Sequence, residues 1–105
     1  MSSYIDRRAK FYGYRQKEHH DIQHYAKVLK KLFKKMKRLH PQPSKPFHKD
    51  TLAITFIYGL FHASVRHKMC LWLKKIQRHE PSRLTLQVVI STAQVIENNF
   101  YNNLF

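Results

Sequence analysis

Apolar residues recur with a helical period along the segment IQHYAKVLKKLFKKMKRL, residues 22–39. When Ile22 is assigned to heptad position a, every later a and d position in the segment is also apolar. These positions hold Ile22, Tyr25, Leu29, Leu32, Met36 and Leu39. The pattern predicts a helix over residues 22–39 with one buried stripe.

The face opposite this stripe is almost wholly cationic. From Lys27 to Arg38 the chain holds seven Lys or Arg residues and no Asp or Glu. Like charges three or four positions apart on a helix repel by about 0.2–0.5 kcal/mol per pair, and no acid is interleaved to offset this. We interpret the face as a binding surface, with Lys35 at its flank and six central residues: Lys27, Lys30, Lys31, Lys34, Lys37 and Arg38.

A second apolar segment, residues 52–65, is hydrophobic nearly all round, which predicts a buried central helix. Three prolines between residues 41 and 46 separate it from the first helix, and Asp50 or Thr51 is its expected N-cap. The helical pattern continues to Arg78. The sequence leaves open whether residues 51–78 form one helix or are broken, either near Gly59 or between residues 64 and 68.

The last segment of the chain also has apolar residues at helical spacing. We expect its helix to begin at Pro81 or Ser82, because proline is favoured in a first helical turn. The opening LTLQVVI is also typical of a strand, but a lone strand has no partner elsewhere in this chain. A helix is therefore predicted, and its apolar stripe consists of Leu86, Val89, Ala93, Ile96 and Phe100.

A short helix is predicted near the N-terminus, from Tyr4 to Tyr12. Ser3 and Asp6 have the spacing of a helix-start pair, and Gly13 is suited to close the helix in a left-handed conformation. The expected fold is thus all-α, with three principal helices plus this short one, and with residues 52–65 packed between the first and last long helices. We expect a single domain, residues 1–105, composed of an arm, 1–17, and a helical bundle, 18–105.

The charge of the chain narrows the class of partner. The chain has 43% hydrophobic residues, which is enough to form a core. Its net charge of +14 and pI near 10.2 mean that its cations repel one another strongly in the folded state. Nucleic acid, an acidic protein surface and an anionic lipid surface are the polyanions that would relieve this repulsion. Residues 80–105 hold one Lys or Arg and two acids, so we do not expect them to contact the polyanion.

The N-terminal arm interleaves cations with aromatic rings. Cations contact phosphates, and rings stack on unpaired bases, so together they are the two components of a single-strand binding surface. The alternative is that the rings pin the arm to the core. The arm's candidate cations are Arg7, Arg8, Lys10 and Arg15, and its candidate stacking residues are Tyr4, Tyr12 and Tyr14.

The sequence argues against a metal or cofactor. His20 and His24 lie one helical turn apart, but no Cys or well-placed carboxylate supplies further ligands. Two glycines cannot form a glycine-rich phosphate loop. The single cysteine, Cys70, cannot form an intramolecular disulfide, and we interpret it as a core residue in a reducing compartment.

Catalysis is not expected either, because the six acids are scattered and the Ser and Thr residues have no identifiable base. The spacing of Arg15 and His20 is similar to the Arg-x4–6-His pair of the HEPN family of helical ribonucleases. That resemblance implies that both side chains would act at a scissile phosphate. No second element of that family accompanies the pair, so we predict a protein that is not an enzyme.

The function predicted from the sequence is non-catalytic binding of nucleic acid through its backbone, with RNA or single strands favoured. Lysine acts as a point charge, so weak sequence specificity is expected. Such a protein suits a small subunit of a larger ribonucleoprotein. A helical adaptor or inhibitor that docks on an acidic protein surface is the alternative, and binding to a membrane surface is a third possibility. We expect no membrane span and a cytoplasmic location, or a nuclear one in a eukaryote. The interface is expected to extend to Lys74, Lys75 and Arg78.

Overall fold

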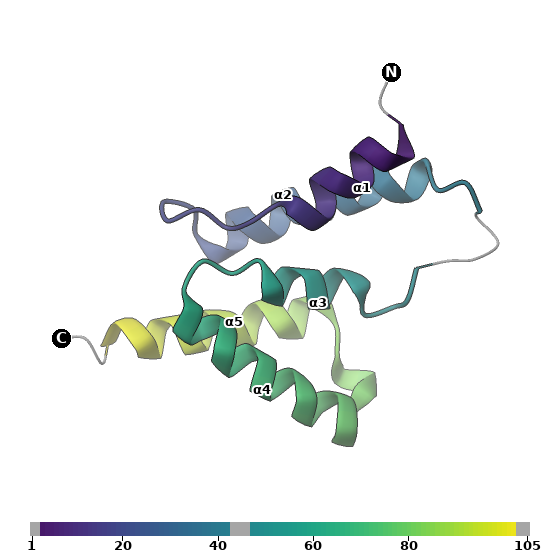
Figure 1. Cartoon of the computed structure of the whole chain (residues 1–105). Helices are drawn as coiled ribbons and strands as arrows, with labels where there is room; N and C mark the ends of the chain where they lie inside the picture. The colour runs from purple at the N-terminus through teal and green to yellow at the C-terminus, as the bar shows by residue number, and fades with distance from the viewer. Residues whose placement is uncertain (1–2, 43–46, 103–105) are drawn as a thin grey trace.

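The computed structural model describes residues 3–42 and 47–102, and their regular structure is entirely helical (Figure 1). This confirms the all-α prediction and the helical interpretation of LTLQVVI. The described residues form five α-helices and one 3₁₀ turn, rather than three principal helices and a short one. The elements are α1 (Tyr4–Gly13), α2 (Ile22–Arg38), α3 (Thr51–Tyr58), α4 (Ala63–His79), η1 (Pro81–Arg83) and α5 (Leu86–Asn102).

The additional helix arises because the segment from Thr51 to Arg78 is broken after Tyr58, at the first of the two positions that the sequence left open. Backbone groups at the break bond outside any helix. The Gly59 carbonyl accepts a hydrogen bond from the Gln16 N–H at 2.8 Å, and the Phe61 N–H donates to the Gln16 side chain at 3.0 Å. The Arg66 guanidinium donates to the Leu60 carbonyl at 2.7 Å. These bonds satisfy polar groups that a continuous helix would have paired internally.

The helices form a thin, flat body. In Figure 1, α1 lies on α2, α3 and α5 occupy the middle, and α4 covers their other side. The Cα atoms span 48 × 34 × 17 Å. Two packed helices measure about 13–15 Å through their backbones, so the short dimension is two helices thick. As predicted, the apolar helix α3 contacts both α2 and α5.

The predicted stripe of α2 is buried over most of its length. Ile22, Tyr25, Leu29 and Met36 are fully buried, and Leu32 is half-buried. Leu39 is 42% exposed, so its assignment to the buried stripe was wrong. The reason is that α2 ends at Arg38 and Leu39 is its C-cap residue, beyond the last packed turn.

The helix ends confirm one predicted cap and correct two others. Ser3 and Asp6 form a reciprocal capping box at the start of α1. Gly13 is the last residue of α1 but does not take a positive φ, so the predicted left-handed closure is wrong. Pro81 opens only the 3₁₀ turn, and α5 begins at Leu86 instead. There the Thr85 hydroxyl accepts a hydrogen bond from the Val88 N–H at 3.2 Å.

The residue predicted to cap α3 is at the start of the helix but does not cap it. Asp50 occupies the N-cap position, but its side chain makes no capping hydrogen bond among the residues the structure describes. It lies buried beside His48, whose Nδ1 is 3.8 Å from an Asp50 carboxylate oxygen. Cys70, predicted to be a core residue, is half-buried against the core.

Tyr25 joins three parts of the chain in the centre of the core. Its ring stacks with the rings of Tyr14 and Phe56, at centroid distances of 5.8 and 5.0 Å. Its hydroxyl donates a buried hydrogen bond to the Phe56 carbonyl at 2.9 Å. Burial raises the pKa of the Tyr25 phenol far above its ordinary value, so the hydroxyl stays a neutral donor.

Gly59 is required where the chain passes this tyrosine. A Cβ placed on Gly59 would overlap the Tyr25 hydroxyl and lie 3.2 Å from the Tyr14 carbonyl oxygen. We predict that Gly59→Ala lowers the free energy of unfolding by about 1–3 kcal/mol, because a rigid buried ring must move. The measurement is urea denaturation followed by circular dichroism.

Gly13→Ala is the matched control, because a Cβ there would have no atom within 4 Å. Gly13 is helical, so this substitution is expected to be neutral or to stabilise by up to about 1 kcal/mol. Equal effects of the two substitutions would contradict the steric role assigned to Gly59.

Candidate nucleic-acid interface

The six central cations of α2 form one continuous basic arc. At 100° per residue they fall within about 120° of the helix circumference, and from Lys27 to Arg38 they extend roughly 17 Å along its axis. All six side chains are exposed. Their direction is fixed because the opposite face of α2 is the buried stripe. We use the name basic arc for Lys27, Lys30, Lys31, Lys34, Lys37 and Arg38.

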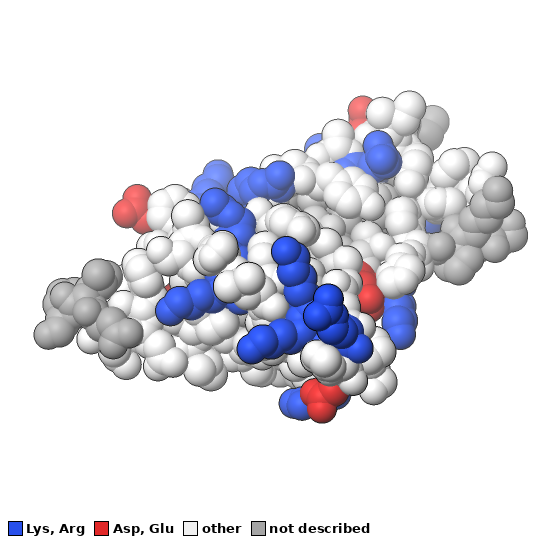
Figure 2. Space-filling model, turned by 60° about the horizontal axis from the view of Figure 1, so that its bottom comes forward, with Lys and Arg blue, Asp and Glu red and all other residues white. Residues whose placement is uncertain are grey.

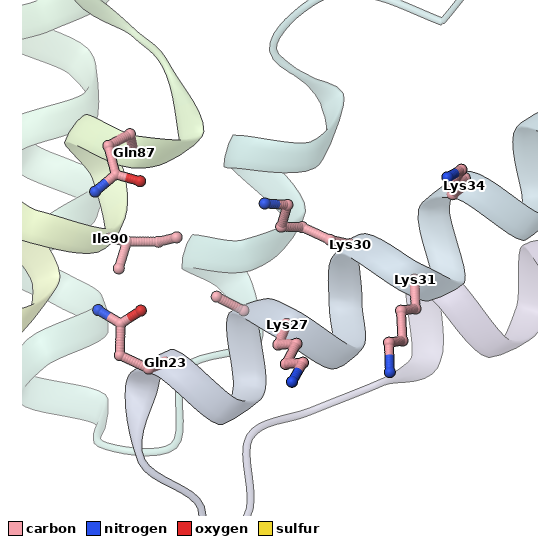
Figure 3. A pocket seen from close by; sticks show the side chains of 8 residues that line it. Gln23, Lys27, Lys30, Lys31, Lys34, Gln87 and Ile90 are labelled. Atoms are coloured by element: carbon pink, nitrogen blue, oxygen red, sulfur yellow. The ribbon is translucent and has the colours of Figure 1, made fainter.

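Part of the basic arc borders a groove between α2 and the start of α5, which we call the lysine groove (Figure 3). Its volume is about 390 Å³. In Figure 3, Lys30 points from α2 toward α5, and the amides of Gln23 and Gln87 lie on either side of Ile90. The groove is lined by Gln23, Ala26, Lys27, Lys30, Lys31, Lys34, Gln87 and Ile90.

The positive charge of the basic arc is not neutralised within the described part of the chain. Arg83 forms an ion pair with Glu80 at 2.8 Å, and no other Lys or Arg in residues 3–42 and 47–102 forms one. One arc residue has another contact, since the Lys37 ammonium lies 5.0 Å from the centre of the Phe33 ring. The arc therefore keeps its electrostatic attraction for an external anion.

The cations predicted on the N-terminal arm lie on or next to α1, which packs on α2. Arg7 is half-buried, and the Arg8 guanidinium lies 5.4 Å from the centre of the Tyr12 ring. Lys10 lines a second, shallow groove with Val28 and Leu32, on the flank of α2 away from α5. Arg15 donates hydrogen bonds to the carbonyls of Tyr12 and Tyr14, at 2.7 and 3.1 Å, so its side chain caps the end of α1.

The three candidate stacking residues have different surroundings. Tyr4 and Tyr14 are half-buried and pack against the core, and the Tyr14 ring faces Tyr25. Tyr12 is exposed on α1. The structure thus gives two of these rings a packing role, which was the alternative weighed for them, and leaves Tyr12 accessible.

The extension predicted on α4 is a separate basic region. Lys74, Lys75 and Arg78 are exposed, but α3 and α5 lie between their helix and α2 (Figure 1). Figure 2 turns the α4 side of the molecule toward the viewer and shows Lys and Arg side chains clustered near its centre, where Asp and Glu are few and separated. The basic arc and the α4 cations therefore belong to different sides of the fold.

Sequence reasoning missed the α5 wall of the lysine groove. Gln87 and Ile90 come from a segment that was set aside because it is nearly neutral. Ile90 lies outside the apolar stripe predicted for this helix, and no local signal indicates that Gln87 lies opposite the lysines of α2. That juxtaposition depends on how two distant helices pack.

A second site that the sequence did not predict is a polar pocket of about 220 Å³. His62 and Tyr101 form a hydrogen bond across it. Burial raises the pKa of the Glu97 carboxyl above its ordinary value, an effect that His62 opposes and Asp21 increases. The residues lining this polar pocket are Gln16, Glu18, His19, His20, Asp21, Phe61, His62, Glu97 and Tyr101.

The polar pocket does not have the geometry of a metal site, and it does not bring together the side chains of Arg15 and His20. In the ranges covered by the structure, no group of three or more His, Cys, Asp or Glu side chains is arranged to hold a metal ion. His20 lines the pocket, but Arg15 does not and is bonded to the end of α1. Arg15 and His20 therefore do not line this pocket together.

No protein-family model, curated protein or solved structure matches this chain. In the described residues, no helix combines the length and the apolar composition needed to cross a lipid bilayer.

The surroundings of His20, beside the polar pocket, disfavour its protonation. Burial lowers the pKa of His20, and His19, His24 and Lys17 lower it further, although Asp21 opposes them. The unfolded chain therefore binds a proton on this residue at a higher pH than the folded chain does. The resulting stability is present above about pH 6.5 and is lost as the pH falls below that value.

We predict that His20→Gln flattens the fall in melting temperature between pH 7 and pH 5. Melting curves followed by circular dichroism across this range provide the measurement. His79→Gln, in the exposed last turn of α4, is the matched control for removal of an imidazole. An unchanged pH profile for His20→Gln would show that the cluster does not contribute to acid sensitivity.

Proposed function

We propose that this protein is a non-catalytic nucleic-acid-binding protein that contacts the sugar-phosphate backbone through the basic arc of α2. The observation that carries the proposal is the arc itself, six exposed cations along one side of one helix with no carboxylate paired to them in the described residues. Charge of this density attracts a polyanion strongly at low salt.

The regular spacing of the arc favours nucleic acid over an acidic protein surface. Neighbouring arc cations are related by steps of three or four residues, which correspond to about 4.5–6 Å along the helix. A nucleic acid strand offers a regular row of charges because its covalent structure repeats. A protein surface would need an uninterrupted row of Asp and Glu to match, and such rows repel themselves.

The lysine content favours contacts that do not depend on base sequence. Five of the six arc residues are Lys, which binds phosphate as a point charge. Only Arg38 has the planar guanidinium that forms two hydrogen bonds to a guanine edge. We therefore propose low sequence specificity. The proposal includes a cytoplasmic location, or a nuclear one in a eukaryote, where nucleic acid is accessible.

A second candidate function is assembly with a protein, either as a subunit of a ribonucleoprotein or as an adaptor that docks on an acidic surface. It is supported by two exposed apolar side chains, one on α4 and one on α5. Leu71 on α4 is 50% exposed, and Val95 on α5 is 58% exposed. Exposed apolar groups of this size are common singly, so this candidate ranks second.

The first test is the salt dependence of binding. If six phosphates are neutralised, the logarithm of the association constant should fall against log salt with a slope of about −4 for single strands and about −5 for duplex DNA. Fluorescence anisotropy with nuclease-treated protein and labelled 12-nucleotide RNA, DNA and duplex measures both slopes. Micromolar or weaker binding to all three probes would overturn the proposal and favour the protein partner.

The second test reverses charge on the arc. Lys31→Glu combined with Lys34→Glu should weaken binding at least tenfold and make the salt slope shallower by about 2, because two phosphate contacts are lost. Both positions are exposed, so the helical circular dichroism spectrum should be unchanged.

Lys74→Glu combined with Lys75→Glu on α4 makes the same change in net charge on the separate basic region. We expect this control to weaken binding much less. Equal losses for the two double variants would show that net charge, rather than the arc, determines affinity.

A further inference from the structure

The lysine groove has two kinds of wall, and only one of them suits a phosphate. Four lysines of α2 line one side, and Lys30 points toward α5 in Figure 3. The floor is apolar, since Ala26 and Ile90 line the groove and are 3% and 6% exposed. The amides of Gln23 and Gln87 stand on either side of Ile90 (Figure 3). A phosphate alone would use the lysines and leave the floor and the amides without a partner.

The two glutamine side chains are free to bind a ligand. Both are exposed, and neither makes a hydrogen bond to another group in residues 3–42 or 47–102. An amide offers two donor hydrogens and an acceptor oxygen, which match the hydrogen-bonding edge of any nucleobase. The apolar floor between the amides is suited to the flat face of a base.

We infer that the lysine groove receives an unpaired nucleotide, so that the preferred ligand of this protein is single-stranded nucleic acid. In this arrangement the phosphate lies against Lys30 and Lys27, the base rests over Ile90, and the base edge bonds to Gln23 and Gln87. This inference rests on the proposed function and specifies its ligand. The groove volume of about 390 Å³ lies in the range of small-ligand sites.

Duplex nucleic acid cannot use the groove in the same way. The bases of a duplex are stacked and paired, and extruding one costs a few kcal/mol. A duplex would contact the arc lysines from outside and leave the glutamines unused. A single strand exposes base faces and edges at no such cost, as proteins that recognise unpaired bases exploit. The groove thus adds a base-dependent contribution to affinity for single strands alone.

The experiment separates this contribution from charge. Three 12-nucleotide probes are compared at one salt concentration: single-stranded RNA, an abasic deoxyribose-phosphate strand of the same charge, and duplex DNA. We expect single-stranded RNA to bind the wild-type protein about tenfold more tightly than the abasic strand does, which is within the range measured for one base contact. Duplex affinity should not depend on the glutamines.

Gln23→Ala combined with Gln87→Ala should weaken binding of single-stranded RNA severalfold, toward the affinity of the abasic strand, and leave abasic and duplex binding unchanged, because only the bonds to the base edge are lost. Both are exposed helix positions and Ala is the strongest helix former, so the fold is retained. Gln77→Ala, an exposed glutamine on α4, is the matched control and should have no effect.

Photocross-linking provides a second measurement that does not depend on affinity. A strand with 4-thiouracil bases should cross-link to residues 84–105, which contain the α5 wall and no Lys or Arg, and so form one tryptic peptide. Cross-links confined to other peptides would overturn the inference. So would equal affinity for RNA and the abasic strand, or a double glutamine variant that binds RNA like the wild type.

Different results would overturn the inference and the proposed function. Base-independent binding that is still lost in the Lys31 and Lys34 double variant would overturn the inference and leave backbone binding intact. No binding of any probe would overturn both.

Discussion

The hydrogen bond from the buried Tyr25 hydroxyl to the Phe56 carbonyl fixes the arrangement of this fold. A phenol without a partner in the core would cost about 1–3 kcal/mol, so the end of α3 must stay next to α2. The same hydroxyl leaves no room for a Cβ on Gly59. The chain breaks at this glycine, and Gln16 bonds to the backbone on both sides of Leu60. The division of the apolar segment into α3 and α4 thus lies at this contact.

The thin body explains how the chain accommodates its charge. The radius of gyration of 14.7 Å exceeds the roughly 13 Å expected for a compact domain of this length. A flat molecule keeps cations far apart and hydrated, which lowers their mutual repulsion. It also limits the core to a single layer of contacts between helices. Stability therefore depends on closely packed aromatic residues such as Tyr25, Phe11 and Phe56, which are all fully buried.

The same packing sets the direction of the proposed binding surface on α2. The buried stripe of α2 holds the helix in one orientation, so the basic arc faces outward along its whole length. Ala26, at the edge of the stripe, is small and buried, and Ile90 on α5 faces the same groove. Core packing and the proposed binding surface therefore share one helix, and the lysine groove exists because two elements meet beside the arc.

The sequence by itself determined the features that depend on neighbours within one or two turns. The all-α class, both faces of α2 and the Ser3 capping box follow from local periodicity and local hydrogen bonds. Only the tertiary structure decided that the apolar segment breaks at Gly59, that Tyr14 packs on Tyr25, and that Gln87 faces the lysines. Each of these depends on residues far apart in sequence, as in the Gln16 to Phe61 bond that spans 45 positions. Local patterns specify which face of a helix is buried, but they do not specify which distant helix covers it.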